Sequence, residues 1–165
     1  MVELLWVMTI IAVLAAGVLS GLAAARRGFM RTKAEAQTKQ VANAFIAYYN
    51  TYGRWPGPSG VYQGQVDWDH LQPLIIPDQN PKRILFMEMK LDKSTTNQMR
   101  QLIDPWGNVY QFRVATGGVN QNVSPDPFTG SGSLNVSVAI WSAGADKQAD
   151  TSGYSGVNAD NPKNW

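Results

Sequence analysis

The segment Val2–Arg27, VELLWVMTIIAVLAAGVLSGLAAARR, decides the fold of this chain. One carboxylate, Glu3, precedes twenty-two uncharged residues, Leu4–Ala25, and the first basic residue is Arg26. An α-helix rises 1.5 Å per residue, so this run extends about 33 Å, enough to cross the hydrocarbon core of a bilayer. The run is longer than the apolar region of a secretory signal, and no cleavage signature follows it. The segment therefore predicts a membrane-spanning helix.

The helical pattern continues beyond the apolar run. Apolar residues recur at steps of three, four and seven, which keeps them on one face of a helix. Gly53 is well placed to end the helix, and Pro56 follows just beyond it. We therefore predict one continuous helix from about Glu3 to Tyr52, about 75 Å long, with an apolar first half and an amphipathic second half. The stripe comprises Met30, Ala34, Val41, Phe45, Tyr48 and Tyr52.

The rest of the chain predicts short elements separated by loops. Glycines and prolines make Arg54–Gly64 a predicted loop. Alternating apolar residues and turn signals predict a small antiparallel sheet, and therefore an α+β fold. The predicted short helices are Asp67–Ile75, capped by Asp67, and Ser94–Ile103; the predicted strands are Ile84–Met89, Val109–Ala115 and Leu134–Ile140; Thr116–Ser133 and Ala143–Trp165 are predicted loops.

Basic residues crowd just past the apolar run, although the net charge of the chain is only +2. They are Arg26, Arg27, Arg31, Lys33 and Lys39. Such a collar is typical of contact with lipid phosphates beside a membrane. A nucleic-acid patch is the alternative, but no nucleic-acid-binding motif accompanies the collar, and we expect no nucleic-acid partner.

The sequence offers little catalytic chemistry. It contains no cysteine, which excludes disulfides, zinc-thiolate sites and thiol catalysis. The single histidine, His70, follows Asp67 and Asp69 in "VDWDHL" but has no nucleophile paired with it, and we expect it on the surface. No zinc-protease motif, nucleophile elbow or phosphate-binding loop is present. We therefore expect that the protein is not an enzyme.

The tail gathers oxygen ligands among glycines. Asp146, Asp150, Asn158 and Asp160 lie within fifteen residues of one another. Carboxylate and amide oxygens on flexible loops suit Ca²⁺, which takes six to eight oxygen ligands. The spacing is not that of an EF-hand, and a solvated acidic loop is the alternative.

The N-terminal segment resembles that of type IV pilins and type II secretion pseudopilins, in which a glutamate opens a long apolar helix. Glu3 falls on the family's glutamate. Four further stretches resemble calcium-type major pseudopilins and their pilin-like relatives. They are "NTYGRWP" (50–56), "NPKRILFMEMK" (80–90), "DPWGNVYQFRV" (104–114) and "VAIWSAGAD" (138–146), and "NADNPKNW" (158–165) resembles their closing segment.

The resemblance implies a pilin-like fold, in which the long helix packs on a small antiparallel sheet and a long C-terminal loop follows. It implies that Glu3 guides assembly by meeting the N-terminal amine of a neighbouring subunit. It also implies Ca²⁺ in the last loop, with ligand roles for Asp146 and Asp160 and weaker ones for Ser142 and Asn158. The family's partners are copies of the same chain, membrane lipid before assembly, a prepilin peptidase and inner-membrane assembly machinery.

The resemblance further implies a single-pass protein of the bacterial inner membrane, with its domain outside the cytoplasm and a periplasmic or extracellular filament after assembly. Counting basic residues near the helix ends instead puts the Arg26 side in the cytoplasm. A basic leader upstream of Met1, which we expect because the family carries more residues before the glutamate, resolves this conflict.

We therefore expect a major pilin or pseudopilin that polymerises through its apolar helix. Its filament half would comprise residues 1–27 and its globular domain 28–165, divided into a half-helix (28–53), an αβ loop (54–83), a β-region (84–142) and a C-terminal loop (143–165). The alternative is a monomeric, membrane-anchored binding domain, which needs no contact between apolar helices.

Overall fold

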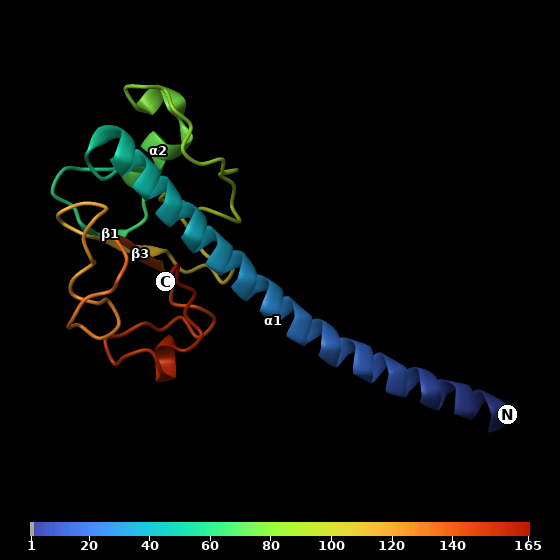
Figure 1. Cartoon of the computed structure of the whole chain (residues 1–165). Helices are drawn as coiled ribbons and strands as arrows, with labels where there is room; N and C mark the ends of the chain where they lie inside the picture. Colours follow the sequence, from blue (N-terminus) through green and yellow to red (C-terminus); the bar gives the residue numbers. More distant parts are fainter. Residues whose placement is uncertain (1) are drawn as a thin grey trace.

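A computed structural model describes residues 2–165, with the side chains of residues 18–21 left undescribed. Met1, and with it the expectation about the start of the chain, lies outside the described residues. The first element, α1 (Val2–Tyr52), is one continuous helix. Its N-terminal half extends away from the rest of the chain, and its C-terminal half lies against it (Figure 1). The predicted single helix is thus confirmed.

The end of α1 is also where the sequence predicted it. The N–H of Gly53 donates to the carbonyl oxygen of Tyr49 at 2.7 Å, and Gly53 has a φ of +69°. A residue in this left-handed region commonly ends a helix, and glycine adopts it without steric cost.

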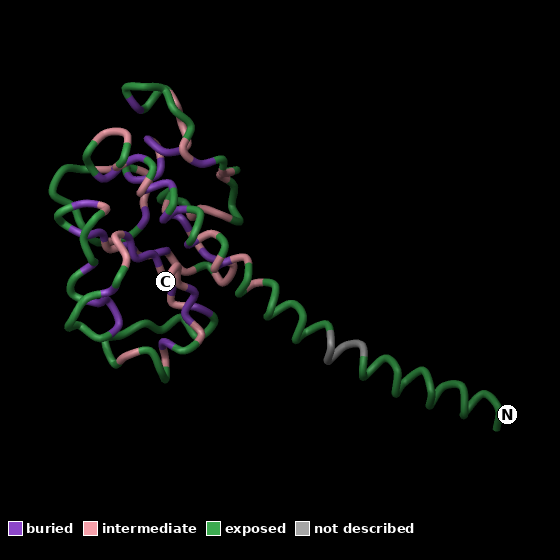
Figure 2. The backbone as a smooth tube through the Cα atoms, in the orientation of Figure 1, coloured by how far each residue is buried: buried purple, intermediate pink, exposed green. Residues whose placement is uncertain are grey.

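The C-terminal half of α1 forms one wall of the core. Ala34, Val41, Phe45 and Tyr48 of the predicted stripe have exposed fractions of 1% or less, and Figure 2 shows burial beginning only in this half of the helix. The hydroxyl of Tyr110, the residue before β2, donates to Gln37 Oε1 at 2.9 Å and links the helix to the start of that strand. The spacing of the stripe therefore reflects packing of the helix on the domain.

Two short helices follow the loop after α1. The helix α2 (Trp68–Ile75) is capped by Asp67, whose side chain accepts from the N–H of His70, as predicted. Leu71 and Leu74 of α2 are fully buried in the core that α1 shares. A short 3₁₀ helix, η1 (Pro77–Gln79), comes next.

The sheet has three antiparallel strands in the order β1-β2-β3. They are β1 (Gln63–Gln65), β2 (Gln111–Val114) and β3 (Val138–Trp141). Phe112 is the partner of Gly64 on one side and of Ile140 on the other. Tyr110, Phe112 and Val114 are buried, as the predicted strand Val109–Ala115 required. The structure is an α+β fold built on a long N-terminal helix and a small antiparallel sheet.

A second apolar cluster gives the sheet another packed side. Ala139 of β3 is fully buried and packs with Val123 and Leu134. Trp141 and Trp165 pack against this cluster from the end of β3 and from the C-terminus. The loop that precedes β3 therefore covers this side of the sheet. A 3₁₀ helix, η2 (Gly156–Asn158), lies in the tail that follows β3.

Two predicted strands differ in the structure. Ile84–Met89 forms no strand, because the N–H groups of Phe86 and Met87 both donate to the single carbonyl of Leu74. The predicted strand Leu134–Ile140 begins only at Val138. Leu134 instead forms an isolated bridge with Val123, which diverts its segment from the sheet.

Two other predictions are wrong. Ser94–Ile103 is not a helix, because Asn97 Oδ1 accepts from the N–H groups of Met99 and Gln101, each at 3.0 Å. Such local bonds compete with helical ones. The predicted loop Arg54–Gly64 runs into β1, whose residues Gln63–Gln65 carry no apolar signal and are ordered by pairing with β2.

Candidate functional site

The most unusual surface of the molecule is the N-terminal half of α1. Its large apolar side chains are exposed to 52–72% from Val2 to Leu14, and Figure 2 shows the described residues of the same half as exposed. Monomeric soluble proteins rarely expose large contiguous apolar patches. By length and composition α1 is the one helix among the described residues that could cross a membrane.

Glu3 lies in the first turn of this helix. A carboxylate there interacts favourably with the positive end of the helix dipole. The side chain is exposed, and no ion pair or hydrogen bond to it is seen within residues 2–165. The charge is therefore available to a group outside the described residues.

The four predicted metal ligands are spread over the start and the end of the tail. The Ser142 hydroxyl donates to Asp104 Oδ2 and accepts from the N–H of Gly144 at 3.2 Å. Asp146 is exposed and accepts from the N–H of Gln148 at 2.9 Å. Ser142 and Asp146 therefore shape the turn that follows β3.

Asn158 organises the tail. Its Oδ1 accepts from the N–H of Asp150 at 3.1 Å and from Asn161 Nδ2 at 3.0 Å. Its Nδ2 donates to the carbonyl of Gly153 at 2.6 Å. The side chain is fully buried, so in this structure its amide holds the loop together.

Asp160 comes closest to a cation ligand. Its Oδ2 accepts from the N–H of Ala145 at 3.0 Å, one residue before Asp146. A Cβ placed on Gly144 would lie 3.0 Å from Asp160 Oδ2, 3.1 Å from Asn161 Oδ1 and 3.1 Å from the Asp160 carbonyl oxygen. Three oxygens therefore converge beside Gly144.

Asn161 was not predicted from the sequence as a possible ligand. Its Oδ1 is buried and has no hydrogen-bond partner among the described residues, although its Nδ2 donates to Gln148 O at 3.1 Å. A buried acceptor without a donor is costly unless something else satisfies it. No group of three or more His, Cys, Asp or Glu side chains that could hold a metal is found in residues 2–165. A cation here would thus draw on the Asp160 carboxylate together with amide and carbonyl oxygens.

His70 is buried, with an exposed fraction of 3%, so its predicted surface position is wrong. Its ring packs between Phe45 and Phe112, with centroid distances of 6.4 Å and 4.5 Å. Its Nδ1 lies 2.5 Å from Asp67 Oδ1. A Cβ on Gly57 would approach His70 Nε2 to 2.8 Å. These contacts lock the ring into the core.

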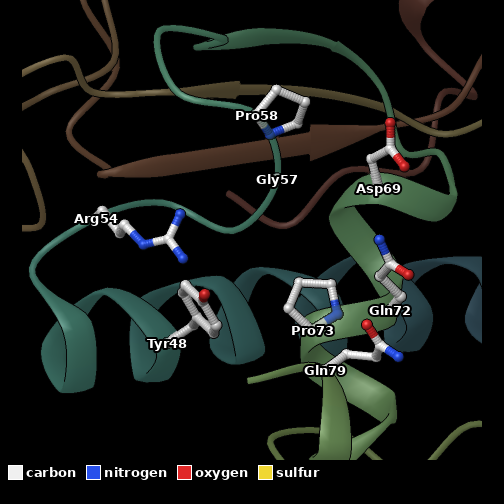
Figure 3. Close-up of a pocket in the computed structure, with 8 residues that line it drawn as sticks. All are labelled: Tyr48, Arg54, Gly57, Pro58, Asp69, Gln72, Pro73 and Gln79. Atoms are coloured by element: carbon white, nitrogen blue, oxygen red, sulfur yellow. The ribbon is translucent and has the colours of Figure 1, made fainter. Parts of the chain in front are cut away.

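A surface pocket of about 260 Å³ lies beside this region, between the end of α1 and α2. Figure 3 shows Arg54 above the ring of Tyr48, with Asp69 and Gln72 projecting from α2. The Arg54 guanidinium carbon is 6.0 Å from the Tyr48 ring centroid. The lining residues include no nucleophile paired with a base, so the pocket does not suggest a reaction.

Comparisons with protein-family models, with curated proteins and with solved structures return no match. The class of protein is therefore defined only coarsely, as an α+β domain carried on a long helix whose exposed apolar half could span a membrane. Function has to be inferred from the residues of the chain itself.

Proposed function

We propose that the chain is a structural subunit, a major pilin or pseudopilin, that polymerises through the apolar half of α1 into a helical filament of a type II secretion or type IV pilus system. One observation carries the proposal. The same helix is apolar over its first half, where the described residues are exposed, and is the buried wall of a small domain over its second half. Before assembly the first half sits in a membrane, and afterwards neighbouring copies cover it.

Two further features support the proposal. Glu3 stands at the exposed end of α1, where an unpaired carboxylate in an apolar environment is costly. A neighbour's N-terminal amine would offset that cost in one helix stagger. The domain lies wholly at the other end of α1 (Figure 1), so it would face outward from a core of packed helices.

The tail would bind Ca²⁺ in this proposal. Asp160 and Asn161 would hold the ion, because their oxygens converge beside Gly144 and Asn161 Oδ1 has no other partner in the described structure. Asp146, next to the backbone that Asp160 binds, would add a carboxylate. The bound ion would fix the end of the tail to the turn after β3.

Crosslinking between helices tests the proposal. The chain has no cysteine, so Val7→Cys and Leu14→Cys in one chain introduce the only two thiols. A short bis-maleimide applied to membranes should give a ladder of covalent oligomers well beyond the dimer. Ser59→Cys and Ser131→Cys, two exposed positions on the domain, form the matched pair outside the apolar half of the helix.

The alternative is a monomeric, membrane-anchored binding domain. It predicts sparse dimers that disappear when the membranes are fused with excess lipid. A ladder from the helix pair that survives this dilution supports a filament; its loss contradicts the proposal.

A further inference from the structure

A groove lies where α1 leaves the domain. It has a volume of about 400 Å³. Arg26, Phe29, Met30 and Lys33 contribute one wall, and their spacing of three, four and seven places them on one face of the helix. The opposite wall comes from Lys93–Ser94 and from the segment between Ile103 and Gly107.

The groove carries positive charge that the protein does not neutralise. Within residues 2–165, Arg26, Lys33 and Lys93 take part in none of the ion pairs, whereas the nearby Arg31 is paired with Glu35 at 3.0 Å. Three unpaired cations around one groove favour an anionic ligand.

The only carboxylate in the lining is already fully engaged. Asp104 is 2% exposed. It accepts from the N–H groups of Trp106 and Asn108 at 2.9 and 2.8 Å, from Asn108 Nδ2 at 2.9 Å, and from the Ser142 hydroxyl. Four donors occupy its oxygens, so the cations of the groove have no strong internal acceptor.

The groove is also apolar, which indicates an amphiphilic ligand. Phe29 is 69% exposed although it lies beside the groove. Met30, Ile103 and Pro105 add further apolar surface. A small hydrophilic anion would use the three cations and leave this surface in contact with water.

The position of the groove along α1 matches the edge of a bilayer. Arg26 is the first charge after the run Leu4–Ala25, which is about as long as the hydrocarbon core is thick. Lys33 lies about 10 Å farther along the helix axis. With the apolar run in the membrane, the lower end of the groove therefore stands in the headgroup layer.

We propose that this groove binds the phosphate headgroup of an anionic phospholipid from the membrane that holds α1. Arg26, Lys33 and Lys93 would contact the phosphate, and Phe29 and Met30 the glycerol and upper acyl region. Because the groove lies on one face of α1, a bound lipid would fix how the domain is rotated above the membrane. The inference rests on the membrane-spanning helix of the proposed function.

The test uses the full chain in detergent, with native mass spectrometry to count retained lipids. Phosphatidylglycerol should be retained in preference to phosphatidylcholine. Lys33→Gln with Lys93→Gln should weaken retention by at least about tenfold, since each lysine near a lipid surface contributes appreciably to attraction. The matched control, Lys90→Gln with Lys147→Gln, removes the same charge at exposed positions outside both the groove and the basic collar, and should retain phosphatidylglycerol as the wild type does.

Three outcomes of the retention experiment by itself would overturn the inference. They are equal retention of the two lipids, equal losses in the test and control variants, or displacement of phosphatidylglycerol by millimolar inorganic phosphate, which would point to a free-anion site. Unchanged lipid retention with reduced helix crosslinking in Lys33→Gln/Lys93→Gln would assign the groove to a second copy and also overturn it.

A separate measurement tests the anchor. The wild-type chain should float with phosphatidylcholine vesicles after detergent removal and resist alkaline extraction. Failure to float would contradict the membrane anchor of the proposed function. Flotation without a preference for phosphatidylglycerol would overturn the groove inference alone.

Discussion

The hydroxyl of Ser142 donates to the buried carboxylate of Asp104, joining two segments that lie 38 positions apart in the chain. Asp104 opens the turn before β2, and Ser142 follows the last residue of β3. Asn108 extends the link, since its Nδ2 also donates to the carbonyl of Gly144 at 2.6 Å. This network therefore connects the turn of "DPWGN" to the first residues of the tail.

Asp104→Ala should destabilise the domain by about 3 kcal/mol, because it leaves several buried donors without an acceptor. Urea unfolding of the full chain in mild detergent, followed by tryptophan fluorescence, measures the change. Asp92→Ala is the control, since Asp92 shapes a similar local turn with Ser94 but is exposed. Its cost should be below about 1 kcal/mol. Equal costs for the two variants would show that the buried network adds nothing.

Calcium should raise the melting temperature of the full chain in detergent, relative to chelator. A ligand that binds only the folded state adds about 2.7 kcal/mol at a hundred times its dissociation constant. Asp160→Ala and Asn161→Ala should each abolish the shift. Gly144→Ala should do so as well, because the added methyl would occupy the space between the three oxygens.

Asp78→Ala, which removes an exposed carboxylate paired only with Arg83 at 3.5 Å, serves as the control for calcium and should keep the full shift. A shift that persists in both Asp160→Ala and Asn161→Ala would place the ion elsewhere. No shift in the wild type would remove calcium from the proposal.

The long helix and its C-terminal end could be predicted from the sequence because the signals for both are local. The spacing of Ala34, Val41, Phe45 and Tyr48 and the glycine at position 53 lie on one continuous segment. The strand β1 could not be predicted in this way. Gly64 has no side chain to show a period, and the strand exists because Phe112 lies opposite it, 48 positions away.

Polar side chains explain the other differences. Asn80 Oδ1 accepts from the N–H of Ile84 at 3.0 Å, and Asn80 Nδ2 donates to the carbonyl of Ile84 at 2.9 Å. The Asn80 side chain therefore takes the place of the strand hydrogen bonds that the apolar segment "ILFMEM" predicted at Ile84. In the tail, Asp146 and Asp160 could be predicted from composition as oxygen donors. The convergence of Asn161 with Asp160 depends on how the backbone folds around Gly144, which the spacing of acidic residues does not reveal.

Tyr154 should make stability fall at alkaline pH. Burial, and then the hydrogen bond that its hydroxyl donates to Asp126, raise the pKa of Tyr154 to about 12. Since a free tyrosine has a pKa of about 10, the folded state favours the neutral phenol. The stability that Tyr154 contributes is fully present below about pH 10, the pKa of the free side chain. It is lost as the pH rises toward 12.

The urea midpoint, measured at a series of alkaline pH values, tests this expectation. It should fall less steeply in Tyr154→Phe than in the wild type, because phenylalanine has no proton to lose. Burial also raises the pKa of Tyr48 and of Tyr110, so these two tyrosines contribute to the slope that remains. Tyr62→Phe, at an exposed position, should follow the wild type. Parallel curves for Tyr154→Phe and the wild type would contradict the prediction.

Glu3 provides the sharpest test of assembly. In the proposed membrane-bound state the Glu3 end of α1 would lie at the bilayer edge, whereas in the proposed filament its carboxylate would enter an apolar core. A buried charge without a partner costs several kcal/mol even after relaxation. If a neighbour's amine supplies the partner, only one stagger of the helices satisfies both groups. Glu3→Gln keeps the shape and removes the charge, so it should insert normally and give little of the Val7→Cys/Leu14→Cys crosslink ladder.

Glu3→Leu separates pairing from hydrophobicity. It should insert at least as well as the wild type and crosslink as poorly as Glu3→Gln, because added apolar surface cannot replace an ion pair. Glu35→Gln is the matched control, since it removes an exposed carboxylate from the same helix, outside the apolar half, where its partner is Arg31. This control should crosslink like the wild type. Full ladders from both Glu3 variants would reduce Glu3 to a helix-start residue favoured by the macrodipole.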